Sequence, residues 1–133
     1  MPTLTRFHIK SAFLWLAAAM TLGIVLALAP IVTLPGWVVY LSPAFFHLIM
    51  VGWVTQMIFG HAPLIFPSVL GRPMAYLPAF YGPLVVLHAS LILRIASDLL
   101  NIVPLRQWGS LLNGVALLLF LGFTGLALGR GRN

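Results

Sequence analysis

The chain of 133 residues is 62% hydrophobic and only 6% charged, with a mean hydropathy of +1.11. Soluble domains carry about a quarter of charged residues, so this composition excludes a water-exposed surface and predicts a membrane protein. The absence of cysteine excludes disulfides, thiolate metal sites, iron–sulfur clusters and cysteine nucleophiles. The net charge of +6 does not indicate a nucleic-acid site, because the basic residues flank apolar runs and form no stripe with exposed aromatic residues.

Four apolar segments have about the 20 residues that a helix needs to cross a bilayer. They predict an all-α four-helix bundle in a single transmembrane domain, with spans over residues 11–29, 43–66, 74–96 and 108–128. The first segment has basic residues before it and small residues at its end, as in a signal peptide. A cut after Ala29 would leave Pro30 directly behind it, which is unfavourable, so we expect this segment to be retained.

Proline positions refine the second and third predicted spans. Ser42 is the expected N-cap of the second span, with Pro43 in the favoured first turn. This helix is expected to bend or end near Pro63. The first half of the third span contains Pro78 and Pro83.

Basic residues in short loops predict the orientation of the bundle. Five of them fall on one side, namely Arg6, Lys10, Arg72, Arg130 and Arg132. The opposite side has Arg94 and Arg106. This excess predicts that both termini lie inside, in a multi-pass protein of the cell inner membrane, with Trp37, Tyr40 and Trp108 at the outer interface.

Histidine is costly inside a membrane and is a functional candidate by default. His47 and His61 lie in the second span and His88 in the third, whereas His8 precedes the first span and is expected in solvent or among headgroups. In a regular helix His47 and His61 share one stripe about 21 Å apart, too far for one metal ion. The alternative for each histidine is a hydrogen bond to a neighbouring carbonyl or serine.

A haem held between two helices needs two axial imidazoles that face each other. His47 and His88 stand about 28 and 21 Å from the inner loop on neighbouring antiparallel helices, which makes them the candidate pair. Met20, Met50 and Met57 are alternative ligands, although methionine usually fills apolar cores.

Other polar residues have two interpretations. Arg94 and Asp98 are four positions apart and are expected to pair along one helix face. Alternatively, Arg94 or Arg106 holds haem propionates together with Trp108. The amides of Gln56 and Asn113 are expected to bridge helices. Small residues in the fourth span favour close helix contact within the bundle or across a homodimer, at Gly122, Gly125 and Gly129.

The second span contains the sequence FHLIMVGWVTQMIFG at residues 46–60. This histidine, short apolar run, Gly-Trp pair and second glycine resemble membrane haem proteins of the NnrS type and small relatives of haem-copper oxidase subunit I. The resemblance continues through Pro67 and the Gly-Arg-Pro turn at 71–73 and covers about residues 43–98. It implies membrane haem binding, often with nitric-oxide or oxygen chemistry, and implies His47 as the haem ligand.

The resemblance does not imply a copper site. The Gly-His-Ala-Pro sequence at 60–63 lacks the Gly-His-Pro-Glu order of the oxidases, and no His-His pair follows. His61 remains a candidate metal ligand.

The sequence supports two candidate functions. The first is a protein that binds haem b, in electron transfer or in handling nitric oxide or oxygen. The alternative is a non-haem accessory subunit of a larger respiratory complex. A small multidrug transporter is disfavoured because the only acidic residue, Asp98, lies near an end of its helix. Without a carboxylate proton relay, binding or electron transfer is expected rather than stand-alone catalysis.

Overall fold

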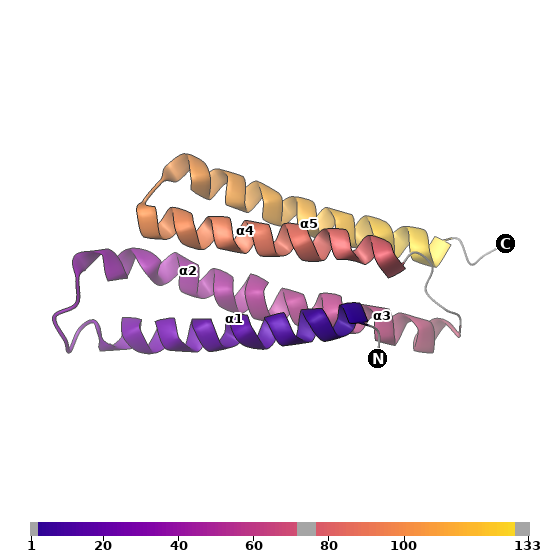
Figure 1. Cartoon of the computed structure of the whole chain (residues 1–133), viewed down its shortest axis with the longest axis horizontal. Helices are drawn as coiled ribbons and strands as arrows, with labels where there is room; N and C mark the ends of the chain where they lie inside the picture. Colours follow the sequence, from indigo (N-terminus) through magenta and orange to yellow (C-terminus); the bar gives the residue numbers. More distant parts are fainter. Residues whose placement is uncertain (1–2, 72–76, 130–133) are drawn as a thin grey trace.

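The computed structural model describes residues 3–71 and 77–129. Four helical segments in this part of the chain are long and apolar enough to cross a membrane, and they run over Thr3–Leu28, Gly36–Val69, Pro78–Leu100 and Val103–Ala127. Figure 1 shows them as antiparallel neighbours, with the start of the first helix and the end of the last at the same end of the bundle. The predicted all-α four-helix bundle is confirmed, and the protein is a membrane protein.

The first helix, α1 (Thr3–Leu28), begins earlier than predicted. Its first turns are amphipathic: Leu4, Thr5 and His8 are buried, whereas Arg6 and Lys10 are exposed. Residues spaced in this way share one helix face, so the apolar side can pack while the basic side reaches water or headgroups. The hydrophobic run predicted over residues 11–29 therefore leaves out only the first turns of this helix.

The second span is one continuous helical rod with changing geometry. A 3-10 helix η1 (Gly36–Leu41) leads into α2 (Ser42–His47), a π-helix η2 (Leu48–Thr55) and α3 (Gln56–Leu70). Ser42 does not cap it, because helical backbone already precedes this residue and Leu41 takes the cap position. The rod also continues past Pro63 and ends at Gly71, whose φ of 66° suits glycine.

The π-helix changes which side chains share a face. Its hydrogen bonds span five residues, so each turn takes more residues than the 3.6 of an α-helix. The Thr55 hydroxyl donates to the Met50 carbonyl at 2.8 Å, also across five residues. The expected common stripe of His47 and His61 was calculated for a regular helix and does not hold across this segment.

The last two spans form a helical hairpin. A 3-10 turn η3 (Leu77–Phe80) precedes α4 (Tyr81–Leu100), and α5 (Val103–Gly129) follows after a short turn. Asn101 closes α4 in the left-handed conformation, with φ 53°, a common helix C-terminal geometry. The predicted start of the third span at 74–76 lies outside the described residues.

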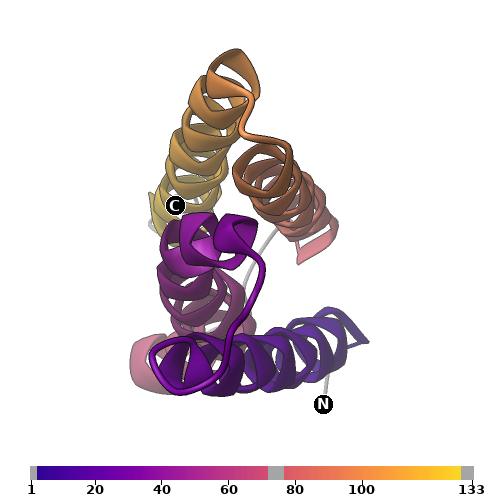
Figure 2. The same ribbon diagram turned by 90° about the vertical axis from the view of Figure 1, so that its left-hand side faces the viewer.

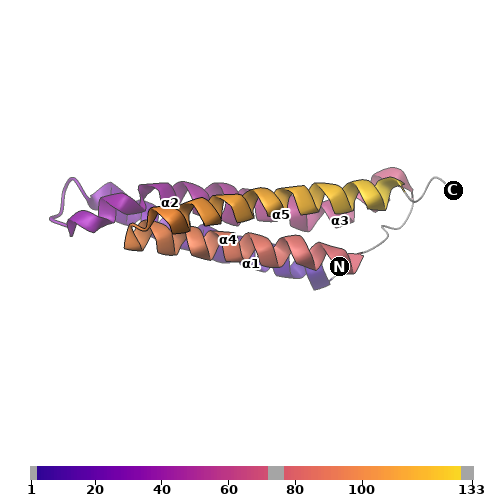
Figure 3. The ribbon, with the colours of Figure 1, turned by 90° about the horizontal axis from the view of Figure 1, so that it is seen from above.

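The helices form an open arrangement rather than a closed square. In the end-on view of Figure 2, α1 lies beside the second span, and the α4–α5 hairpin lies on the other side of that span. Figure 3 shows α4 and α5 side by side along their length. Phe59 of the second span stacks on Phe120 of α5, with ring centroids 3.8 Å apart, and joins the hairpin to the rest of the bundle.

Glycines allow close helix contact within the bundle at other positions than those predicted in the fourth span, where contact across a homodimer stays a prediction. An added Cβ at Gly122, Gly125 or Gly129 would meet nothing within 4 Å among the described residues, so these positions do not serve contact within the bundle. A Cβ at Gly52 would lie 2.8 Å from the Trp15 Cβ, and one at Gly60 would lie 2.7 Å from the His8 Cβ. The tightest of these contacts therefore lie between α1 and the second span, and Gly109 of α5 also lies close to α4, since an added Cβ would be 3.3 Å from the Arg94 backbone nitrogen.

Candidate functional site

Asp98 is the centre of a polar cluster at one end of the α4–α5 hairpin. Arg94 Nε donates to Asp98 Oδ2 at 3.1 Å, which confirms the predicted pair. Arg106 Nε lies 3.0 Å from Asp98 Oδ1 in an ion pair without the alignment of a hydrogen bond. The Asp98 carboxylate is fully buried, so one carboxylate holds two guanidinium groups from two helices.

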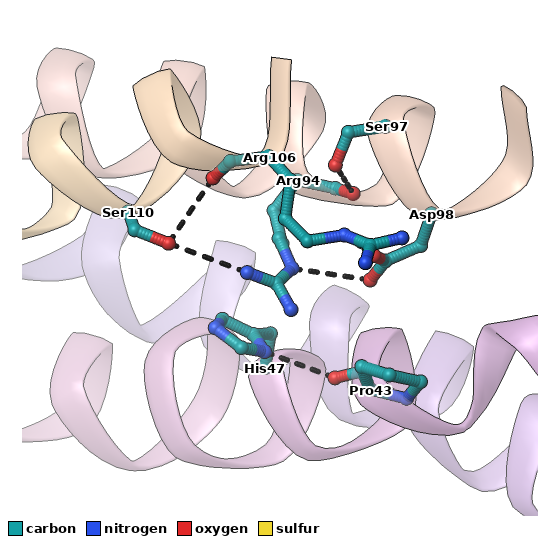
Figure 4. A network of polar contacts seen from close by, with 7 residues as sticks. All are labelled: Pro43, His47, Arg94, Ser97, Asp98, Arg106 and Ser110. Carbon is teal, nitrogen blue, oxygen red and sulfur yellow. Dashed lines mark hydrogen bonds and ion pairs between the residues drawn. The ribbon is translucent and has the colours of Figure 1, made fainter. Parts of the chain in front are cut away.

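Ser110 and His47 complete the group, which we call the outer cluster because it lies toward the end of the bundle away from the start of α1 and the end of α5. It is defined as His47, Arg94, Asp98, Arg106 and Ser110. Arg94 Nη1 donates to the Ser110 hydroxyl at 3.3 Å, which in turn donates to the Arg106 carbonyl at 3.1 Å. In the view of Figure 4 the His47 ring of the second span lies next to the Arg94 guanidinium, and its hydrogen bond runs to the Pro43 carbonyl. Two arginines and one aspartate leave the cluster with an excess positive charge.

An open cavity of about 570 Å³ adjoins the outer cluster. It is lined by Arg94, Arg106, Gln107, Ser110 and Leu111. Trp108 does not line it, and its side chain is 62% exposed. Of the residues expected to hold haem propionates, Arg94 and Arg106 line this cavity and Trp108 does not.

A second polar group lies inside the bundle and joins three spans. This central cluster consists of His8, Ser11, Gln56 and His88. Gln56 Oε1 accepts from His8 Nδ1 at 2.9 Å and from the Ser11 hydroxyl at 3.1 Å. Gln56 Nε2 lies 3.1 Å from His88 Nε2. The prediction that Gln56 bridges helices is confirmed, since it connects α1 with α4.

The prediction that His8 lies in solvent or among headgroups is wrong. His8 is 1% exposed instead of lying in solvent, because α1 begins at Thr3 and turns this position toward Gly60. The signal that could have found it is the spacing of Leu4, His8 and Ala12, which places all three on one helix face.

The structure does not bring His47 and His88 together. His88 contacts Gln56, nine positions further along the second span than His47, whereas His47 lies at the outer cluster. Spacing along a helix gives heights, but the direction of each side chain depends on packing and on the π-helix. His61 lies on a separate open groove of about 390 Å³ with apolar neighbours. Within residues 3–71 and 77–129, no three His, Cys, Asp or Glu side chains gather as metal ligands.

His47, His61 and His88 share one local geometry. Each places Nδ1 within 2.7–2.9 Å of the carbonyl oxygen four residues earlier, at Pro43, Met57 and Leu84 respectively. A carbonyl can only accept, so Nδ1 is the donor in each contact, and in the corresponding tautomer of a neutral imidazole the lone pair lies on Nε2. In His88 this lone pair accepts a hydrogen bond from the Gln56 amide. Metal-bound histidines are commonly oriented by a carbonyl in this way.

Replacing Gln56 with leucine is expected to lower the free energy of unfolding by about 1–3 kcal/mol, because buried His8 and partly buried His88 lose a hydrogen-bond partner. Thermal unfolding in detergent, followed by circular dichroism, measures this change. Asn113→Leu is the matched control. The Asn113 amide oxygen is buried without a hydrogen-bond partner in the described part of the chain, and this control should therefore cost little. Equal losses in both variants would contradict the role of Gln56.

Comparison with known proteins shows the family of the chain. No curated protein and no solved structure matches it. A family described as a domain of unknown function, DUF8744, matches residues 2–128. Because this match covers nearly the whole sequence, the chain belongs to the DUF8744 family.

Proposed function

We propose that this protein binds haem b at its outer cluster and acts in electron transfer or in handling nitric oxide or oxygen. The proposal places it in the cell inner membrane with both termini inside. The observation that supports it is the position of His47, whose Nδ1 bonds to the Pro43 carbonyl, at the end of the bundle that holds the ion pairs of Arg94 and Arg106. Such a combination suits a ligand with a metal ion and carboxylates.

The residues of the outer cluster fit the iron atom and the propionate groups of a haem. The Nδ1–H of His47 is held by the Pro43 carbonyl, so Nε2 is available to iron. Arg94 and Arg106 are donors for propionates, and Arg106 Nε has no hydrogen-bond partner in the described residues. Asp98 lowers the cost of holding two cations in a membrane helix hairpin. Bound haem supplies one-electron chemistry or an iron atom for a diatomic gas. His88 lies outside this site.

His47→Ala is expected to abolish haem binding, because this variant removes the proposed iron ligand. The measurement is the visible spectrum of protein purified from haem-replete cells, oxidised and reduced, with and without nitric oxide. The variant should lack the Soret band of the parent protein. His61→Ala is the matched control and should keep the band, since His61 lines a different groove. A folded but colourless parent protein would refute haem binding.

A non-haem accessory subunit of a larger respiratory complex is the second candidate. The open arrangement favours it, because α1 packs mainly on the second span and much of its surface remains exposed. The exposed side chains of α1 include Phe13, Leu14, Met20 and Ile24. Copurification with a larger complex, in the absence of pigment in this chain, would distinguish this role from the first.

A further inference from the structure

A groove between α1 and α4 leads from the lipid-facing surface to the central cluster. Phe7 and Ser11 of α1 line it, together with Leu84, Val85 and His88 of α4, and its volume is about 320 Å³. Phe7 and Val85 are 55% and 65% exposed, so the groove is open on the side that faces lipid. A ligand would enter from the bilayer, and the groove has room for one small ring.

Two buried groups next to His88, outside the lining of the groove itself, have hydrogen-bond donors to spare. The Trp15 indole N–H is buried and has no acceptor among the described residues, and its ring centroid lies 6.1 Å from that of His88. The Gln56 amide nitrogen has two hydrogens, and among the described residues its contacts are to His88 alone. A buried donor without an acceptor is costly, so a ligand oxygen that accepts hydrogen bonds would be stabilised here.

The charge of the site narrows the class of ligand. Asp98 is the only carboxylate in the sequence and is held by Arg94 and Arg106 in the outer cluster. The groove is lined by apolar side chains, one hydroxyl and one imidazole, with no guanidinium or ammonium group. Such a site favours a neutral ligand that dissolves in lipid, has a flat ring and carries acceptor oxygens.

We infer that the groove binds the head of a membrane quinone. The quinone carbonyl accepts hydrogen bonds at the central cluster, the ring lies between Phe7 and His88, and the isoprenoid tail leaves past Val85 into the bilayer. This inference does not rest on haem binding, because the groove and the outer cluster are formed by different residues.

The test is photolabelling of the protein in lipid nanodiscs with a short-chain azidoquinone, followed by peptide mass mapping. We expect labels on residues 7–15 and 84–88. An excess of unlabelled short-chain quinone should remove them, whereas an isoprenoid hydrocarbon without the ring should not. Labelling of all lipid-facing helices alike, or equal competition by the hydrocarbon, would overturn the inference.

Two matched variants separate the groove from general membrane partitioning. Val85→Trp places an indole in the groove while leaving every residue of the central cluster in the sequence, and it should lower labelling about tenfold. Ile58→Trp places the same indole on the groove beside His61 and should leave labelling unchanged. Val85 and Ile58 are both exposed, so both variants should fold, which circular dichroism checks. Unchanged labelling of Val85→Trp would overturn the inference. The assay is run with and without haem, and its result is therefore separate from that of the haem spectrum.

Discussion

Asp98→Asn is expected to lower the free energy of unfolding by about 2–4 kcal/mol, because it leaves two guanidinium groups without their shared carboxylate. Breaking a fully buried ion pair typically costs about 3–5 kcal/mol. The side chains of Arg94 and Arg106 are 13% and 33% exposed, so solvent reduces the loss. Unfolding with increasing sodium dodecyl sulfate in mixed micelles, followed by circular dichroism, measures the change.

A triple variant is the control for this first prediction. Replacing Asp98, Arg94 and Arg106 together with leucine or methionine removes the charges as well as the pairing. Buried ion pairs are often replaced by apolar residues at little cost, so the triple variant should recover most of the stability lost in Asp98→Asn. If Asp98→Asn proved as stable as the parent protein, the carboxylate would not hold the hairpin end together.

The double variant Gly52→Ala, Gly60→Ala is expected to separate α1 from the second span and to cost about 2–4 kcal/mol. The new methyl groups would lie 2.8 Å from the Trp15 Cβ and 2.7 Å from the His8 Cβ. Each Cβ is fixed to its backbone, so a side-chain rotation cannot relieve the contact and the helices must move apart. The midpoint of thermal unfolding in detergent measures the loss.

Gly114→Ala, Gly122→Ala is the matched control for the glycine prediction. A Cβ at either position would meet nothing within 4 Å among the described residues, and alanine favours helix more than glycine does. This pair should therefore be neutral or slightly stabilising. A loss of stability equal to that of the α1 interface variant would show that glycine flexibility matters more than close contact.

Composition and the lengths of apolar runs were enough to predict the class, the four crossings and the arrangement of the helices as antiparallel neighbours. These properties follow from the free energy of transferring each segment into lipid, which depends on local sequence alone. The Arg94–Asp98 pair was predictable for the same reason, because a separation of four residues sets neighbours on any α-helix. Gln56 was identified as a bridge because an amide in the middle of a span needs a partner.

The partners of these side chains depended on packing between segments far apart in the sequence. Arg106 reaches Asp98 because α5 folds back on α4, and His8 meets Gln56 because α1 begins before its hydrophobic run. The π-helix after His47 changes the number of residues per turn and therefore the direction of every later side chain. Spacing along a chain specifies height in the membrane, whereas the direction of a side chain around its helix is set by the neighbours against which that helix packs. For this reason His47 and His88, a pair in the sequence analysis, belong to two different clusters.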